Sequence, residues 1–424
     1  MTIRRRIAWA AFASASACVP LLAYTGCTRT SASAPGPAPW LFVWAADADS
    51  ADSDFLAVID VRPSEPTYGE VVATLPVGAR GSMPHHTEYE YPPDHRLLAN
   101  SWTAGRTFII DLSDPRSPRL AGELPPVEGY AYPHSFARLP NGNVLATYQS
   151  GTAGYGPGGG IVELDAGGHI VRSASAVTPR IGSDLNWPYS LAVIPGVDRV
   201  VTTSADMGMP PWEEWTYRDT HDLHVWSLSE FRLLTTVSLP PSPEGRHNIA
   251  PAEPRVLDDG TVYVNTFTCG LYRIDGLDGP APTATFVHAF PGGMSDHDIC
   301  AVPVVMGKYW VQTAAGLPGL IALDVSDPAA PVEVSRLTLD PQTYPMPHWL
   351  GADRAGDRMV LTGDPHSWIL IVHIDPLTGA MSIDGSFRDA GTERAGIDFD
   401  RLRWPHGETG RALVHGAVFG GPRH

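Results

Sequence analysis

The hydrophobic residues of this chain recur as short runs that alternate with polar residues, and one such run returns seven times. Most copies end in an aspartate, and each is followed by a turn and another strand-like run. The copies cover residues 55–60, 107–111, 160–165, 223–227, 271–275, 320–324 and 369–375. Successive copies lie about 50 residues apart, a period typical of a propeller with four strands per blade.

A further pair of strand-like runs precedes each of the later copies, and one more pair follows the last. Turn residues such as Asn141-Gly142 separate the two runs. The predicted first strands begin at His86, His134, Tyr189, Glu253, His297, His348 and Asp400. The count closes if the run 401–404 joins the N-terminal runs 41–44, 55–61 and 70–76, which removes open sheet edges. We therefore predict an all-β, seven-bladed β-propeller with four-stranded blades, in which N- and C-terminal strands close one blade.

The N-terminal end has the pattern of a secretory leader. Arg4, Arg5 and Arg6 precede an apolar, small-residue-rich stretch that ends near Cys27. This pattern predicts a signal in residues 1–26, a proline-rich linker in 27–39 and one propeller domain in 40–424. Small residues before Cys27 resemble a lipoprotein cleavage site, and both lipidation of Cys27 and ordinary cleavage nearby fit. We expect an exported protein of the periplasm or the outer face of a bacterial membrane, and a lipid at Cys27 would be its one means of membrane attachment.

The net charge limits the class of partner, and the cysteine content bears on the cellular compartment. The formal net charge is −17, which repels phosphate backbones, so we expect no nucleic-acid partner. Beyond the leader and Cys27, only Cys269 and Cys300 remain. The repeat places them at one blade junction, so we expect them to lie close together, either as a disulfide or as two buried thiols.

The histidines are concentrated at equivalent places of the repeat. The first strand of a propeller blade lines the central channel, so residues that begin these strands converge on the axis. Histidine occupies four of the seven positions, and the set is His85 with His86, His134, His297 and His348. One such histidine usually bonds to backbone, but a set at equivalent positions favours a metal. Imidazole suits copper, zinc, iron and nickel, so we predict a first-row transition metal here.

Polar residues at the other first-strand positions are candidates for proton handling. Glu253, Asp400 and Tyr189 occupy these positions. The carboxylates could also bind the metal or hold histidine N–H groups. Among the remaining histidines, His406 is expected to be exposed, and His221 and His224 to be structural.

The chain resembles the selenium-binding protein / methanethiol oxidase family. The resemblance rests on residues 55–69, the paired His85-His86, Pro133-His134, residues 222–228 and the phrase 402–405. It implies a seven-bladed propeller and, in bacterial members, an exported copper enzyme. That enzyme oxidises methanethiol with O2 and water to formaldehyde, hydrogen sulfide and hydrogen peroxide.

Three departures from the family pattern bear on this expectation. The family's cysteine after the paired histidines is absent from residues 86–91, which leaves selenium binding by that cysteine unsupported. Asp400 stands where the family has a histidine. His297 and His348 stand where the family has other residues, so these two positions rest on the repeat alone.

The sequence supports two functional hypotheses. The favoured one is an exported, metal-dependent oxidase of a small thiol, with O2 as the second substrate. The alternative is a non-enzymatic metal-binding or partner-binding propeller at the cell surface, because propellers serve both classes.

Overall fold

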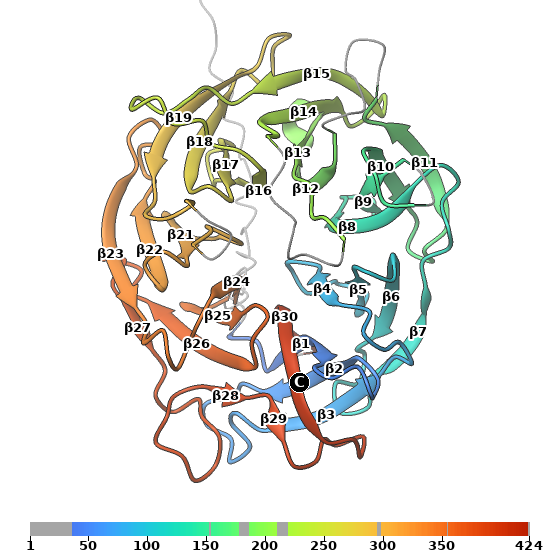
Figure 1. Cartoon of the computed structure of the whole chain (residues 1–424), viewed down its shortest axis with the longest axis vertical. Helices are drawn as coiled ribbons and strands as arrows, with labels where there is room; N and C mark the ends of the chain where they lie inside the picture. Colours follow the sequence, from blue (N-terminus) through green and yellow to red (C-terminus); the bar gives the residue numbers. More distant parts are fainter. Residues whose placement is uncertain are drawn as a thin grey trace, which may run out of the picture. The chain divides into compact units, whose positions relative to one another are not determined.

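The strands form seven antiparallel sheets that stand around a central axis as the blades of a propeller (Figure 1). This computed structural model describes residues 36–151, 154–177, 186–209, 219–294, 298–353 and 355–422. The seven repeated runs of the sequence form the third strand of each blade, counted outward from the axis. The predicted all-β, seven-bladed architecture is therefore confirmed.

Six blades follow one another along the chain, each with its first strand innermost. The first comprises β4 (Pro84–Thr87), β5 (Arg96–Ser101), β6 (Arg106–Asp111) and β7 (Arg119–Glu123). The second comprises β8 (Ala131–Arg138), β9 (Val144–Ser150), β10 (Gly158–Leu164) and β11 (Ile170–Ser175). The third comprises β12 (Pro188–Ile194), the 3-10 turn η1 (Pro195–Val197), β13 (Arg199–Ser204), β14 (Asp222–Ser227) and β15 (Arg232–Ser238).

The next three blades repeat this order. The fourth comprises β16 (Pro251–Val256), β17 (Val262–Thr266), β18 (Gly270–Asp275) and β19 (Thr283–Ala289). The fifth comprises β20 (Val304–Met306), β21 (Tyr309–Ala314), β22 (Gly319–Asp324) and β23 (Val332–Thr338). The sixth comprises β24 (Pro347–Ala352), β25 (Arg358–Gly363), β26 (Trp368–Ile374) and β27 (Met381–Ile383), with β28 (Ile397–Asp398) paired to β26.

The closing blade joins the two ends of the described chain, as predicted, but with a different C-terminal strand. It comprises β30 (Gly410–Gly420), β1 (Trp40–Asp47), β2 (Phe55–Asp60) and β3 (Val71–Pro76). The innermost strand is β30, which pairs along the whole of β1 from Trp40↔Gly420 to Asp47↔Ala412. The predicted run 401–404 is not that strand. Only β29 (Asp400–Arg401) forms there, and it pairs with the start of β30.

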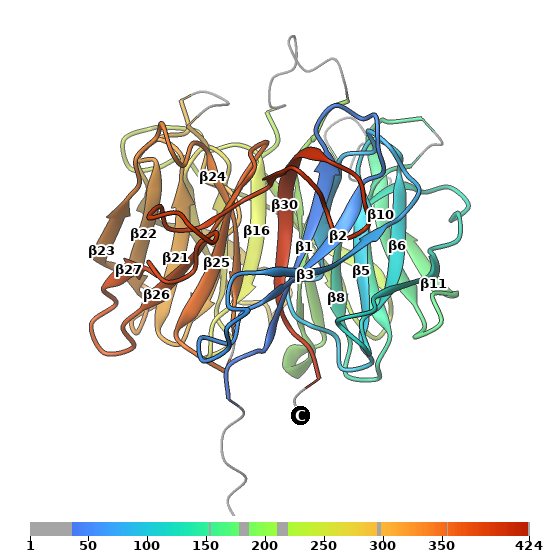
Figure 2. The same cartoon turned by 90° about the horizontal axis from the view of Figure 1, so that it is seen from below.

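Burial changes from the axis to the rim and explains the sequence pattern. All six residues of β2 are buried, and the four central residues of β6 are buried as well. The outermost strand β23 instead alternates between exposed and half-buried residues. Inner and middle strands pack between neighbouring sheets on both faces, so they are continuously apolar, whereas rim strands show the simple alternation of a half-buried strand. Figure 2 shows the strands running between the two faces of the ring.

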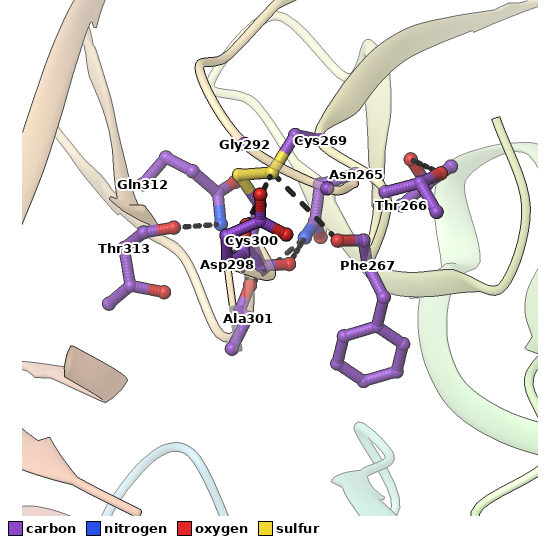
Figure 3. Close-up of a disulfide and its surroundings, with 12 residues drawn as sticks. Asn265, Thr266, Phe267, Cys269, Gly292, Asp298, Cys300, Ala301, Gln312 and Thr313 are labelled. Carbon is purple, nitrogen blue, oxygen red and sulfur yellow. Dashed lines mark hydrogen bonds between the residues drawn. A yellow bond between two sulfur atoms is a disulfide. The ribbon is translucent and has the colours of Figure 1, made fainter. Parts of the chain in front are cut away.

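Cys269 and Cys300 form a disulfide with Cα atoms 5.0 Å apart, which confirms that they lie together (Figure 3). The bridge links the turn between β17 and β18 to the segment that enters the next blade. The predicted leader and Cys27 lie outside the described residues. Within the part of the chain that the structure describes, no helix is long and apolar enough to cross a membrane.

Candidate metal centre

The inner strands share a backbone feature that explains the repeated Pro-His phrase of the sequence. A residue with positive φ precedes the proline in four blades: Met83 (54°), Tyr132 (59°), Ala250 (53°) and Met346 (51°). The proline follows, and pairing with the second strand shifts register just after it, as between Pro84 and Thr87 or Pro133 and Phe136. Proline lacks an N–H donor, which is tolerated on an edge strand and at a bulge. In three of these blades the residue directly after the proline is a histidine, namely His85, His134 and His348.

Side chains of the second strands hold these bulges in place. Asn100 on β5 accepts a hydrogen bond from the His86 backbone N–H at 2.6 Å and donates to the carbonyls of Pro133 and His134 at 2.9 and 3.0 Å. Thr147 on β9 accepts from the Ser135 N–H and donates to the Tyr189 carbonyl at 2.7 Å. Each of these side chains, which we call a clamp, therefore fixes the inner strand of its own blade and that of the next.

Five imidazoles from four inner strands meet at the axis. Ring centroids are 4.4 Å apart for His85 and His86, and 4.3 Å for His86 and His134. His415 on β30 lies 4.0 Å from His85 and 4.7 Å from His348. All five residues are buried, none more than 7% exposed. The structure thus brings together four of the predicted ligands and adds His415.

Ring nitrogens of all five histidines are buried without a hydrogen-bond partner among the described residues. The set is His85 Nδ1, His86 Nε2, His134 Nε2, His348 Nε2 and both nitrogens of His415. Buried polar atoms are rarely left unpaired, and each costs about 1–3 kcal/mol. His134 shows what the arrangement suits: its Nδ1–H donates to the Tyr189 carbonyl at 2.9 Å, which leaves the Nε2 lone pair free. The donor set therefore fits a first-row transition metal.

Two groups of side chains that include these histidines have the spacing of a metal site. In the first, one ligand atom each from His85, His86 and His415 lies within 4.8 Å of the others. In the second, the same holds for His348, Asp364 and His415. His134 lies beside the first group, with its ring 4.9 Å from that of His85.

Electrostatics keep these rings neutral, which is the form that binds metals. Burial lowers the pKa of His134 to about 3 and that of His348 to about 4. Burial, and then the neighbouring imidazoles, hold the pKa values of His85, His86 and His415 well below the usual value. Burial also raises the pKa of Asp364 to about 7.

Sequence reasoning missed His415 because it took the wrong strand as innermost. Asp400 was assigned to the ring of channel-lining residues, but it is exposed on β29, which pairs with the start of β30 and lies toward the rim of the propeller (Figure 1). The available signal was the largely apolar run of residues 412–419, which contains His415. Gly416 allows close packing here, since a Cβ at this position would lie 2.8 Å from the His85 carbonyl oxygen. His297 lies outside the described residues. On the fifth blade Ala301 occupies the position equivalent to His134, since Asn265 donates to the Ala301 carbonyl as Asn100 donates to that of His134.

Glu253 lies fully buried beside the histidines, as its repeat position indicates. Its Oε2 accepts hydrogen bonds from Tyr89 Oη and Ser190 Oγ, both at 2.7 Å, and from Arg255 at 2.8 Å. The Tyr89 hydroxyl is also 3.2 Å from His86 Nδ1. Glu253 Oε1 has no partner within the described chain. This network connects the imidazoles to a cavity of about 250 Å³ beside β12, β16, β20 and β24, which Tyr89 and Arg255 line.

The other histidines lie away from the centre. His406 was expected to be exposed, but its side chain is only 6% exposed and bonds to Thr74 and Glu408, because the hairpin before β30 folds back onto β3. His224 is buried and bonds to Asn186. His221 lies 3.5 Å from Asp219.

Comparison with known proteins places the chain in a family. The family model described as 56 kDa selenium binding protein (SBP56) matches residues 27–269, more than half of the chain. A second model, the LVIVD repeat, matches residues 304–338, which form the fifth blade.

Named relatives match parts of the chain. A methanethiol oxidase of Hyphomicrobium sp. is 29% identical over 229 residues, covering 50% of this chain and 51% of that protein. Selenium-binding protein 3 of Arabidopsis thaliana is 32% identical over 298 residues, covering 64% and 57%. The chain spans about half the length of the first curated relatives it matches.

Solved structures support the fold. The X-ray structure of a hypothetical selenium-binding protein from Sulfolobus tokodaii superposes with a TM-score of 0.69 at 17% identity, covering 91% of this chain and 94% of that one. A periplasmic gluconolactonase of Pseudomonas aeruginosa gives 0.58 at 12% identity, with 89% and 96% covered. At these identities the likeness concerns the fold alone. With the family model covering more than half of its length, this chain belongs to the 56 kDa selenium-binding protein family.

Proposed function

We propose that this protein is an exported copper oxidase of a small thiol such as methanethiol, with the metal held by the axial histidines. The observation that carries the proposal is the meeting of five buried imidazoles whose ring nitrogens lack partners among the described residues. The substrate class comes from the relatives that are named methanethiol oxidase.

The donor set and the reaction together favour copper. Imidazole nitrogens suit copper, zinc, iron and nickel, and the two described cysteines are joined in a disulfide and offer no thiolate. Zinc has no redox chemistry, so it cannot serve as the working ion of an oxidase. Bound copper would accept electrons from the thiol and pass them to O2. In the balanced reaction, methanethiol, O2 and water, in equal amounts, give equal amounts of formaldehyde, hydrogen sulfide and hydrogen peroxide.

We assign proton handling to Glu253 rather than to Asp400. A thiol that reacts as thiolate must give up its proton, and Glu253 is the carboxylate connected to His86 through the Tyr89 hydroxyl. Asp400 is exposed on β29, which lies toward the rim of the ring (Figure 1). Tyr189 positions His134 through its carbonyl, and its ring lies 4.0 Å from the imidazole.

Export is part of the proposal, and the disulfide supports it. Disulfides persist in oxidising compartments such as the periplasm. The basic, apolar N-terminal pattern of residues 1–26 predicts the same destination, with a lipid at Cys27 as the means of membrane attachment.

The test compares His134→Ala with His169→Ala, a control at an imidazole that is 82% exposed and paired with Asp165. Metal content and thiol-dependent O2 uptake are measured on protein purified from the periplasm. We expect His134→Ala to lower both together and the control to lower neither. Unchanged metal in His134→Ala contradicts the site. Metal that is lost in the variant, with no O2 uptake by the parent on any small thiol, establishes the non-enzymatic metal-binding alternative instead.

A further inference from the structure

We propose a second metal position beside the first, formed by His348, Asp364 and the second ring nitrogen of His415. It would take a divalent first-row ion such as Zn2+ or Cu2+. The inference rests on the proposed function, because the first position (His85, His86, His134 and His415) is the centre proposed above.

Asp364 is the residue that separates this position from an all-histidine site. It follows β25, and its backbone N–H donates to the Met346 carbonyl at 3.2 Å. The same loop is tied to β30 by the bond from the Val414 N–H to the His366 carbonyl at 2.9 Å. These bonds set the Asp364 carboxylate 3.8 Å from His415 Nε2. Its side chain is 24% exposed and makes no hydrogen bond within the described chain, so its oxygens are available to a ligand.

His415 has a ring nitrogen available for each position. Both its nitrogens are buried without a hydrogen bond within the described chain, whereas one ion uses only one nitrogen of an imidazole. The ring belongs to both groups that have metal-site spacing. An imidazole can bind two ions, one at each nitrogen, once its ring proton has left. The ring proton then passes to solvent as the second ion binds, in the way metal binding commonly releases protons.

The two positions differ in chemistry. The first offers only imidazole nitrogens. The second offers two imidazoles and one carboxylate, a set that catalytic zinc sites use with a coordination position left open. His348 Nε2 has no partner among the described residues, and the carboxylate supplies the negative charge that a divalent ion favours. An open position there can hold water or a thiolate beside the first ion.

The experiment counts tightly bound metal ions per chain. Metal-free protein is loaded with Cu2+ or Zn2+, dialysed against a weak chelator and analysed by mass spectrometry of the metals. We expect about two ions per chain in the parent and about one in Asp364→Asn. The matched control is Asp357→Asn, an aspartate of the same blade whose side chain is 55% exposed and contacts His373; it should retain two. Thermal unfolding of the metal-free variants checks that each still folds.

The outcomes separate this inference from the proposed function. One ion in the parent, lost in His134→Ala, overturns the second position and leaves the first standing. Two ions in both the parent and Asp364→Asn overturn the role of Asp364. No tightly bound ion in the parent overturns both. If Asp364→Asn fails to fold, His348→Ala takes its place, with the same loss of one ion expected.

Discussion

Two sides of the channel wall share backbone features but differ in their side chains, which are histidines on one side and alanines on the other. On β4, β8, β24 and β30 the ring positions hold His85, His134, His348 and His415. On β16 and at the entry to β20 the same positions hold Ala252 and Ala301. The clamps match as well: Asn100 holds the inner strands on the histidine side, and Asn265 holds them on the alanine side, donating to the Cys300 and Ala301 carbonyls at 2.9 Å.

The two sides share the backbone features of the propeller and differ in the side chains that could bind a metal. The proline and the residue of positive φ occur on both sides, for example Met83-Pro84 and Ala250-Pro251, so they belong to the propeller and not to the metal centre. The alanine side also carries the Cys269–Cys300 bridge directly before Ala301. The alanine side therefore carries a covalent cross-link, and the histidine side presents unpaired imidazole nitrogens. This arrangement agrees with the rule that propellers serve many functions through residues added to a common fold.

The largest effect should come from removing the two clamps in turn. Asn100→Ala and Asn265→Ala each leave one N–H and two carbonyls without their side-chain partner, which should cost about 3–5 kcal/mol in unfolding free energy. Metal affinity should fall only in Asn100→Ala, because that clamp fixes the backbone of His86 and His134. Denaturant unfolding and metal titration measure the two quantities. Equal loss of metal affinity in both variants would remove the distinction between the sides.

A smaller effect concerns pH and the metal-free protein. An unfolded histidine has a pKa of about 6.5, and burial lowers that of His348 to about 4 and that of His134 to about 3. The unfolded state therefore binds more protons below pH 6.5. The contribution of each such ring to the free energy of unfolding is fully present above that pH. It is lost as the pH falls toward the pKa of the ring in the folded protein. Each such ring should contribute a slope of about 1.4 kcal/mol per pH unit.

Urea unfolding at several pH values between 7.5 and 4.5 tests this slope. His348→Ala should flatten the decline below pH 6, whereas Asn265→Ala should lower stability at every pH and leave the slope as it is. A parent protein whose unfolding free energy stays level down to pH 4.5 would mean that the rings take up protons in the folded state.

The sequence predicted the parts of the molecule that repeat. A step of about 50 residues predicted the blades, and the phrase Pro-His predicted His85, His134 and His348 because rotation places equivalent residues on a circle. The proximity of Cys269 and Cys300 followed from the same repeat. These predictions needed only periodicity and turn chemistry.

Features that break the repeat could not be read in this way. His415 follows a valine, not a proline, on a strand that joins the opposite end of the chain. Asp400 was chosen in its stead because it matched the spacing, although it pairs only with the start of β30. Asp364 lies in a loop outside the inner strands, where no periodic signal exists. Side chains that reach the site from loops become visible only in three dimensions.

The measurement that tests the account most directly is anomalous diffraction at the copper edge from crystals of the copper-loaded protein. We predict a peak at the axis, about 2.0–2.1 Å from imidazole nitrogens of His85, His86, His134 and His415. Nothing of comparable height should lie on the alanine side. A strongest peak at a surface histidine such as His169, or an empty axis in copper-loaded crystals, would contradict the central claim that the unpaired imidazoles form the metal centre.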